Sequence, residues 1–307
     1  MTPEPQNLTV SRIPMGTLVR SSASPRTLFG NVMTTLTVGA AAIALLPLVA
    51  VLTYVIIKGA SRLDLGVFTQ LPPAPGIAGG GFGNAIVGTL VMVVIAALIS
   101  VPFGVMAAIF VSEFGGKKPI VFWIRFATNV LSGVPSIVVG VFTYSIIVIK
   151  GGFSLGLGFS AFAGGVALSV LMLPIIVRTS EESLKLVPQE IRQASVGIGA
   201  TNFQTVFFVV LPAALPAIVT GTMLAVARAA GETAPLIFTA LFSQYWSHGI
   251  FEKSASLGVL VYNFSIVPGG PQFINQQQLA WAGALVLVVM ILITSILSRL
   301  ATGKRTY

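Results

Sequence analysis

Two charged residues of opposite sign, Arg228 and Glu232, lie inside a long apolar stretch that runs from Phe207 to Phe242. They are four residues apart, so a helix would place both side chains on one face. A charge in the middle of a membrane costs about 2.5–3.5 kcal/mol on insertion scales, and such charges usually face a cavity or a partner. Because Arg before Glu stabilises a helix less than the reverse order, helix stability explains the pair poorly.

The chemistry that this pair offers is the binding of an oxyanion. The planar guanidinium of Arg228 stays ionised and can hold two oxygens at once. Glu232 would neutralise Arg228 when no anion is bound and would keep an anion from binding too tightly, and Thr233 follows as a further candidate for the pathway. Pro235 lacks an N–H for the carbonyl of Gly231, so we expect the helix to loosen just beyond the pair. The alternative is an ion pair that only joins two subunits.

A second group of polar and helix-breaking residues interrupts another apolar stretch. It consists of Ser132, Gly133, Pro135 and Ser136. A broken helix inside a protein can present free N–H groups and hydroxyls to an anion, which makes Ser132 and Ser136 candidates for a substrate pathway. A proline kink that serves only packing is the alternative. Arg178 is either a guard of the cytoplasmic exit or an interfacial arginine whose charge reaches the membrane surface.

These residues require a scaffold that spans a membrane, and the composition indicates one. The chain is 55% hydrophobic and 8% charged, whereas soluble domains carry about 25% charged residues. A spanning helix needs about 20 predominantly apolar residues. We therefore expect an all-α polytopic membrane protein in which the fourth span is short and the fifth is long enough to tilt or break. The six expected spans are Val32–Ile57, Asn84–Val111, Phe126–Ile149, Phe162–Val177, Val209–Phe242 and Leu279–Leu297.

The basic residues predict the orientation of these spans. With the amino terminus inside, twelve of the 17 lysines and arginines fall in inner segments: Arg12, Arg20, Arg26, Lys117, Lys118, Arg125, Arg178, Lys185, Arg192, Arg299, Lys304 and Arg305. The outer segments hold only Lys58, Arg62, Lys150 and Lys253. The positive-inside rule then places both termini in the cytoplasm. We expect a cytoplasmic tail over residues 1–30, a six-helix permease domain over 31–300 and a second tail over 301–307.

Several classes of function are disfavoured by what the sequence lacks. There is no cysteine and only one histidine, His248, so no disulfide framework and no metal site is expected. The basic residues are scattered between apolar stretches, so the net charge of +9 does not indicate nucleic-acid binding. We expect no catalytic residues, because no nucleophile–base constellation is visible. No phosphate-binding loop or dinucleotide fingerprint is present, so no cofactor is expected in this chain and any energy source must lie on a partner.

The longest inner segment, residues 179–208, has the pattern of a short helix between two turns. Thr179 with Glu182 and Thr201 with Gln204 have the spacing of a capping box. This segment contains "QAS" (Gln193, Ala194, Ser195), followed after three residues by Gly199. After nine further residues comes "VVLP", which includes Leu211 and Pro212. This spacing resembles the E-A-A-x3-G-x9-I-x-L-P loop of the permeases of ABC importers. The resemblance implies the type I importer fold and a coupling helix that binds a cytoplasmic ATPase.

Two further stretches narrow the resemblance. "LSGVPSIVVG" from Leu131 and "ARAAGETAPLIFTA" from Ala227 are similar to sequences of the A-type permease subunits of the Pst phosphate transporters. This implies import of inorganic phosphate across the bacterial inner membrane. The implied partners are a homologous second permease subunit, two ATPase subunits that hold ATP and Mg²⁺, an extracytoplasmic phosphate-binding protein and membrane lipid. A permease for sulfate or molybdate, or an ion-gradient-driven transporter or channel, remains the alternative.

Overall fold

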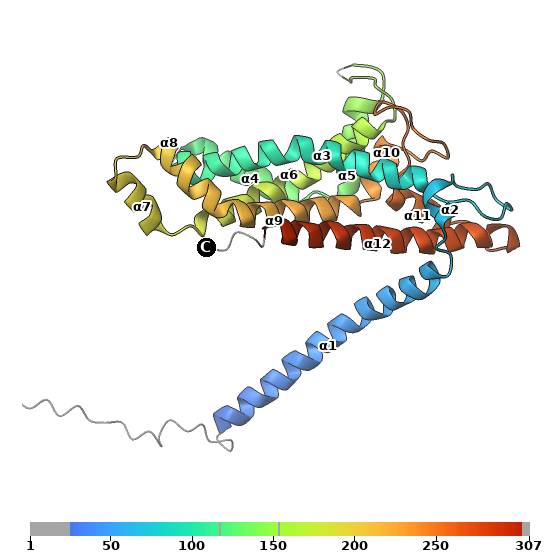
Figure 1. The fold of residues 1–307 in the computed structure, drawn as a ribbon, viewed down its shortest axis with the longest axis horizontal. Coiled ribbons are helices and arrows are strands. Elements are labelled where there is room, and N and C mark those ends of the chain that lie inside the picture. The colour runs from blue at the N-terminus through green and yellow to red at the C-terminus, as the bar shows by residue number, and fades with distance from the viewer. Residues whose placement is uncertain (1–24, 117, 153, 303–307) are drawn as a thin grey trace, which may run out of the picture. The chain divides into compact units, whose positions relative to one another are not determined.

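The computed structural model describes residues 25–116, 118–152 and 154–302, and all regular structure in these residues is helical (Figure 1). Most of the expected tails, residues 1–30 and 301–307, lies outside the described residues. The chain divides into two compact units, Met1–Tyr54 and Val55–Tyr307. The long apolar helix α1, Pro25–Ala60, begins in the first unit and ends in the second.

The second unit contains the remaining helices. Their bounds are α2 Leu65–Thr69, α3 Gly83–Ile109, η2 Phe110–Phe114, α4 Pro119–Gly133, α5 Ser136–Thr143, η3 Tyr144–Val148, α6 Ala161–Lys185, α7 Gln189–Gly197, α8 Asn202–Thr205, η4 Val206–Val210, α9 Leu211–Ala230, α10 Ala234–Thr239, α11 Leu257–Ser265, η5 Pro271–Phe273 and α12 Ile274–Thr302. Five helices of the described chain are long and apolar enough to cross a membrane. Helix α4, followed by α5 and η3, forms a sixth, bent span. The expectation of an all-helical, six-span membrane protein is confirmed.

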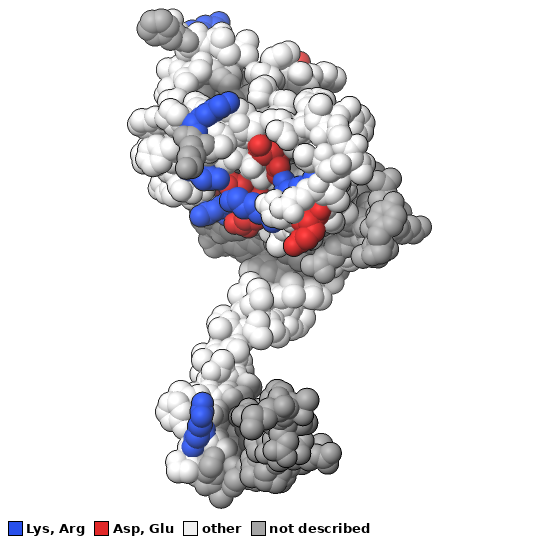
Figure 2. All heavy atoms as spheres, turned by 90° about the vertical axis from the view of Figure 1, so that its left-hand side faces the viewer, with Lys and Arg blue, Asp and Glu red and all other residues white. Residues whose placement is uncertain are grey.

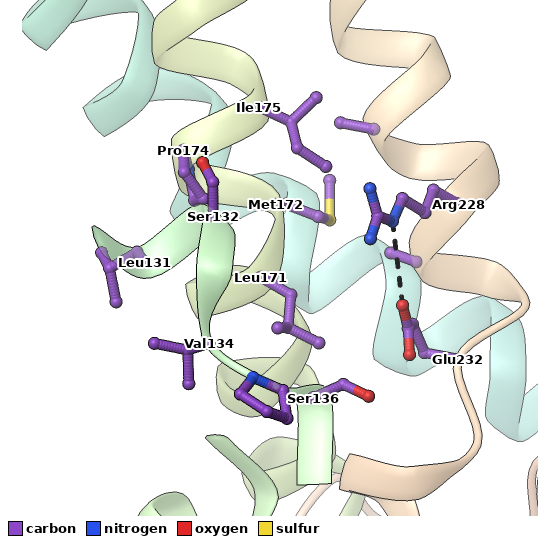
Figure 3. Close-up of a pocket in the computed structure, with 13 residues that line it drawn as sticks. Leu131, Ser132, Val134, Ser136, Leu171, Met172, Pro174, Ile175, Arg228 and Glu232 are labelled. Carbon is purple, nitrogen blue, oxygen red and sulfur yellow. Dashed lines mark ion pairs between the residues drawn. The ribbon is translucent and has the colours of Figure 1, made fainter. Parts of the chain in front are cut away.

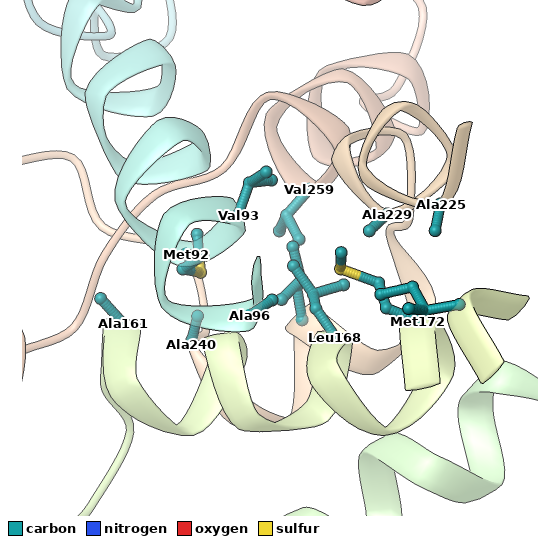
Figure 4. Packing of buried hydrophobic residues seen from close by; sticks show 12 residues of the cluster. Met92, Val93, Ala96, Ala161, Leu168, Met172, Ala225, Ala229, Ala240 and Val259 are labelled. Atoms are coloured by element: carbon teal, nitrogen blue, oxygen red, sulfur yellow. The ribbon is translucent and has the colours of Figure 1, made fainter. Parts of the chain in front are cut away.

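Helix α6 lies at the centre of the bundle and packs against α3 and α9. Met92 of α3 and Leu168 and Met172 of α6 are fully buried in the main apolar cluster (Figure 4). The helices approach closely because small residues stand at the contact: a Cβ on Gly104 would lie 2.7 Å from Ile176 Cγ2. Within a membrane, close packing of this kind drives helix association more than hydrophobic burial does. The core therefore holds α6 rigidly between its neighbours.

The third span is broken, as its sequence predicts. Helix α4 ends at Gly133, α5 begins at Ser136, and the two segments are bent by 105°. Pro135 precedes the first residue of α5 and cannot donate an N–H to a carbonyl of α4, so the helix cannot continue through it. The short helix α5 then packs against α10.

The fifth span also breaks, but not where we expected. The prediction placed Arg228 and Glu232 on one face of a continuous helix that loosens beyond them; instead α9 ends at Ala230, between the two residues. The N–H of Gly231 returns to the carbonyl of Arg228 at 3.1 Å, and that of Glu232 to Ala229 at 3.1 Å. Pro235 is the second residue of the next helix, α10, a position in which its missing N–H costs no helical hydrogen bond.

The inner segment contains the expected short helix, α7, but α6 reaches further than predicted. Helix α6 runs for 25 residues to Lys185, so the fourth span is not short, and Thr179 is not a cap because its hydroxyl donates to the carbonyl of Ile175 within the helix. The capping box of Thr201 and Gln204 is present. The glycine turn is present as well, since Gly199 has φ +92°, a conformation that residues with a Cβ rarely adopt.

The outer segments hold structure that the sequence analysis did not foresee. Helix α11 is too short to span a membrane, so a search for long apolar stretches passes over it, yet Leu257 and Leu260 are fully buried. It is capped by Ser256, which accepts a hydrogen bond from the N–H of Val259 at 3.3 Å. A buried hydrogen bond from the N–H of Leu257 to Thr89 Oγ1, 2.9 Å long, joins α11 to α3.

Charged side chains gather at the end of the bundle that carries α7, where basic and acidic residues are mixed (Figure 2). The described basic residues of this end are Lys118, Arg125, Arg178, Lys185 and Arg192, all from segments predicted to be cytoplasmic. The residues predicted to lie outside, such as Lys58, Arg62 and Lys150, belong to segments near α2 and η3, at the opposite end of the bundle (Figure 1). The basic residues of the bundle are thus separated by end, although which end faces the cytoplasm stays a prediction.

Candidate functional site

A cavity of about 220 Å³ lies where the break between α4 and α5 faces the break between α9 and α10 (Figure 3). Helix α6 closes one side of it. Arg228, Glu232, Ser132 and Ser136, all candidates from the sequence, line this cavity. The other lining residues are Leu131, Val134, Pro135, Leu171, Met172, Pro174, Ile175, Ala225 and Ala229. Two interrupted helices that are far apart in the sequence thus contribute to one site.

Arg228 is the chemical centre of the cavity. Its side chain is 70% exposed, and its Nε lies 3.9 Å from Oε1 of Glu232. This distance is too long for a hydrogen bond, and no hydrogen bond to either side chain occurs within the described residues. Figure 3 shows the guanidinium turned toward the cavity beside Met172, with Glu232 below it. The donors of Arg228 and the acceptors of Glu232 are both left available to a ligand.

The two serines differ in what they can donate. The hydroxyl of Ser132 already donates to the carbonyl of Thr128 at 2.7 Å, within α4. Ser136 has no hydrogen-bond partner in the described part of the chain, and it is the first residue of α5. The N–H groups of a helix's first turn lack partners within the helix and favour negative charge. Ser136 and the start of α5 therefore provide donors on the side of the cavity opposite α9.

The remainder of the lining is mostly apolar. Leu171, Met172 and Ile175 of α6, together with Leu131 and Val134, surround the polar groups. Apolar walls lower the local dielectric constant, and this strengthens the attraction between Arg228 and an anion. The cavity combines a fixed positive charge, several neutral donors and one carboxylate acceptor, which suits a small oxyanion that still carries a proton.

Two candidates from the sequence lie outside this cavity. Thr233 faces α11, where a Cβ on Gly258 would lie 2.6 Å from Thr233 Oγ1. Arg178 is exposed and lines a separate cavity of about 310 Å³ at the α7 end of the bundle, together with Arg125, Glu181 and Lys185. The structure does not bring either residue to Arg228.

The sequence analysis missed the ion-pair network beside Arg178. Oε1 of Glu181 lies 2.7 Å from Nη2 of Arg125 and 2.6 Å from Nζ of Lys185. Glu181 and Lys185 are four residues apart on α6, so their pairing has a signal in the sequence. Arg125 lies on α4, 56 positions away, and no local pattern points to it. This network joins α4 to the end of α6 that leads to α7.

The residues of the coupling motif separate into exposed and structural groups. Gln193 and Ala194 are exposed on α7, whereas Ser195 is buried and its hydroxyl lies 2.9 Å from that of Thr205. Leu211, the first residue of α9, packs against an apolar cluster at this end of the bundle, and Pro212 is the second residue of this helix. Gln193 and Ala194 are thus exposed, and the other motif residues shape the segment that carries them.

Residues 100–305 match the family of binding-protein-dependent transport system inner membrane components. The chain belongs to this family. It is therefore a multi-pass component of the inner membrane. A relative named phosphate transport system permease protein PstA from Yersinia pestis is 39% identical over 260 residues, which cover 85% of each chain. The protein of the same name from Mycobacterium leprae is 35% identical over 287 residues, covering 92% of this chain and 91% of the relative.

Solved structures with the same fold are importers of other substrates. A chain of a bacterial ABC transporter involved in the import of the polysaccharide alginate aligns with a TM-score of 0.62 at 13% identity, covering 92% of this chain and 97% of that one. A chain of the inward-facing MetNI methionine ABC transporter gives 0.51 at 20% identity, covering 73% and 94%. At these identities the likeness shows the fold alone, which is the expected fold of ABC-importer permeases.

Proposed function

We propose that this chain is the transmembrane permease subunit of an ATP-driven importer of inorganic phosphate. The observation that carries the proposal is the guanidinium of Arg228, exposed to a cavity between two broken helices and paired only loosely with Glu232. The PstA relatives, 34–40% identical to this chain, support phosphate as the substrate.

Each group in the cavity has a distinct part in passage of the anion. Arg228 holds two phosphate oxygens, and Ser136 with the first N–H groups of α5 donates to the others. Glu232 accepts a hydrogen bond from a protonated phosphate oxygen and pairs with Arg228 once the anion has left. Because the carboxylate competes for Arg228, binding is weak enough for release. Thr233 and Arg178 lie outside this cavity and line the pathway on either side of it.

The energy for transport comes from partner subunits. Helix α7, with Gln193 and Ala194 exposed, binds one of two ATPase subunits, which hold ATP and Mg²⁺ and carry out the hydrolysis. A homologous second permease supplies the other half of the pathway, and an extracytoplasmic binding protein delivers phosphate. Both termini lie in the cytoplasm, and this chain contributes no catalytic residue.

The test is reconstitution of the complete transporter in proteoliposomes with labelled phosphate. We expect phosphate uptake that requires ATP and the binding protein, and phosphate-stimulated ATP hydrolysis. Uptake driven by an ion gradient without ATP would contradict the proposal. Inhibition of uptake by excess sulfate or molybdate, as strong as that by unlabelled phosphate, would assign the pathway to another oxyanion.

A further inference from the structure

Helix α7 is attached to the rest of the protein by polar contacts rather than by apolar packing. The only buried residue of α7 is Ser195, and no residue of this helix belongs to the described apolar clusters. A cavity of about 580 Å³ lies beneath the helix, lined by Glu113, Arg192 and Thr205 among others. Apart from the short chain segments that join α7 to α6 and α8, a displacement of α7 is therefore transmitted to the bundle through a small number of hydrogen bonds.

Arg192 makes the strongest of these contacts. Its Nη1 pairs with Oε2 of Glu113, and its Nη2 donates to the carbonyl of Leu184 at 2.7 Å. The side chains of Arg192 and Glu113 are only 15% and 7% exposed, and the residues are 79 positions apart. This one arginine joins α7 to the end of α3 and to the end of α6. Its third nitrogen, Nε, is buried without an acceptor among the described residues.

Two of the three polar contacts of α7 end in or directly beside a π-helical turn. Glu113 lies within η2, which continues α3, and Thr205, the partner of Ser195, directly precedes η4, which leads into α9. Such turns are rare, occur often at functional sites and are places where a helix bends. They allow the inner ends of α3 and α9 to follow α7 while the rest of each helix stays packed.

We infer that Arg192 and Glu113 are positioning residues that couple movement of α7 to α3 and α6. The inference rests on the proposed function, in which an ATPase binds α7. When the ATPase displaces α7, the ion pair pulls on η2 and the hydrogen bond to Leu184 pulls on the end of α6. Helix α6 forms one wall of the cavity that contains Arg228, so the displacement reaches the anion site. Without the ion pair, α7 still binds the ATPase but moves over the empty space beneath it.

The experiment measures phosphate transported per ATP hydrolysed by the reconstituted transporter. We expect Glu113→Gln and Arg192→Gln to leave the complex assembled and hydrolysing ATP, while transport per ATP falls about fivefold or more. The exchanged variant Glu113→Arg with Arg192→Glu should recover part of the ratio. Lys185→Gln is the matched control, because it removes an ion pair at the same end that lies within a single helix, and we expect its ratio to stay near the wild-type value.

A second variant tests whether a covalent link can replace the ion pair. The chain has no cysteine, so Glu113→Cys with Arg192→Cys introduces one thiol pair that a cleavable bifunctional maleimide can join. The cross-link is formed in a complex that has already been assembled and purified. We expect transport per ATP to rise on cross-linking and to fall again on cleavage.

The outcomes separate this inference from the proposed function. If the wild-type complex shows no ATP-driven phosphate uptake, the proposed function fails. If the wild type transports phosphate and the Glu113 and Arg192 variants keep its ratio of transport to hydrolysis, the coupling role is refuted while the function stands. An equal loss in the Lys185→Gln variant would likewise refute it, because a general effect of charge at this end would then explain the result.

Discussion

Gly140 of α5 packs directly on Pro235 of α10: a Cβ built on Gly140 would lie 2.6 Å from the Cα of Pro235. Each residue follows the break in its own span, so this contact joins the second halves of the two broken helices. The position of Ser136 relative to Arg228 depends on it, because Ser136 begins the helix that contains Gly140. The shape of the cavity thus depends on the close approach of α5 to α10, which the missing side chain of Gly140 permits.

Gly140→Ala is expected to reduce phosphate uptake while complex assembly is retained. The added methyl group meets backbone atoms of Pro235, which cannot move without displacing α10 or α5. Gly133→Ala is the control, since a Cβ at that position has nothing within 4 Å. Uptake in proteoliposomes should fall for Gly140→Ala alone, and equal uptake by both variants would show that this contact does not set the cavity.

Replacing Arg228 separates its charge from its shape. Arg228→Lys keeps the charge but not the planar pair of donors, so we expect uptake to fall about tenfold or more, as loss of a charged hydrogen bond would produce. The double variant Arg228→Gln with Glu232→Met should assemble and be inactive. Labelled-phosphate uptake and recovery of the complex check both results. Near-normal uptake by the double variant would assign the pair a structural role, because neutral substitutes often replace buried ion pairs without loss.

The two serines of the cavity form a matched pair of variants. Ser136→Ala removes a hydroxyl that has no partner in the described residues, so we expect weaker phosphate uptake. Ser132→Ala removes a hydroxyl whose hydrogen is already committed to Thr128 and should have little effect. The apparent affinity for phosphate in ATPase stimulation is the measurement. A larger effect of Ser132→Ala would contradict this assignment of donors.

Gly199→Val is expected to stop binding of the ATPase while the protein stays inserted. Nothing lies within 4 Å of a Cβ at this position, so the effect comes from the positive φ, which a β-branched residue strongly resists. Gly197→Val is the control, because Gly197 has equal space and a negative φ. Co-purification with the ATPase should be lost only for Gly199→Val. Unchanged recovery would refute a need for this turn.

The short helix α2 should loosen at acid pH. The N–H of Val67, together with Arg62, holds the pKa of Asp64 below its usual value against the opposing effect of desolvation. A lowered pKa in the folded state means that the stabilisation is present above the ordinary pKa of about 4 and is lost as the pH falls through the folded value. The protection of the Val67 amide against hydrogen exchange, corrected for the intrinsic pH dependence of exchange, should therefore decrease below about pH 4. Asp64→Asn keeps an acceptor oxygen and should remove this pH dependence; persistence of the dependence would implicate another group.

Local chemistry in the sequence was sufficient for the number of spans, the break in the third span and the turn at Gly199. Apolar length predicts the membrane helices, Pro135 and Pro235 each mark an interrupted span, and the spacing around Gly199 predicts a turn. These features depend on near neighbours in the chain, through steric limits on φ or a missing N–H, so they can be read without a fold. The same reasoning was wrong for Thr179. The spacing of a capping box can occur in the middle of a helix as well as at its first turn, and the local sequence does not distinguish the two cases.

What only the tertiary structure decided is which distant residues meet. Arg228 and Ser136 share a cavity because α6 holds two broken helices on either side of itself, and no local pattern encodes that distance. The pairing of Arg192 with Glu113 is hidden for the same reason. The end of α9 between Arg228 and Glu232 was likewise visible only in the structure. A side chain's partner across the bundle is determined by how the helices pack, and packing depends on all of them at once.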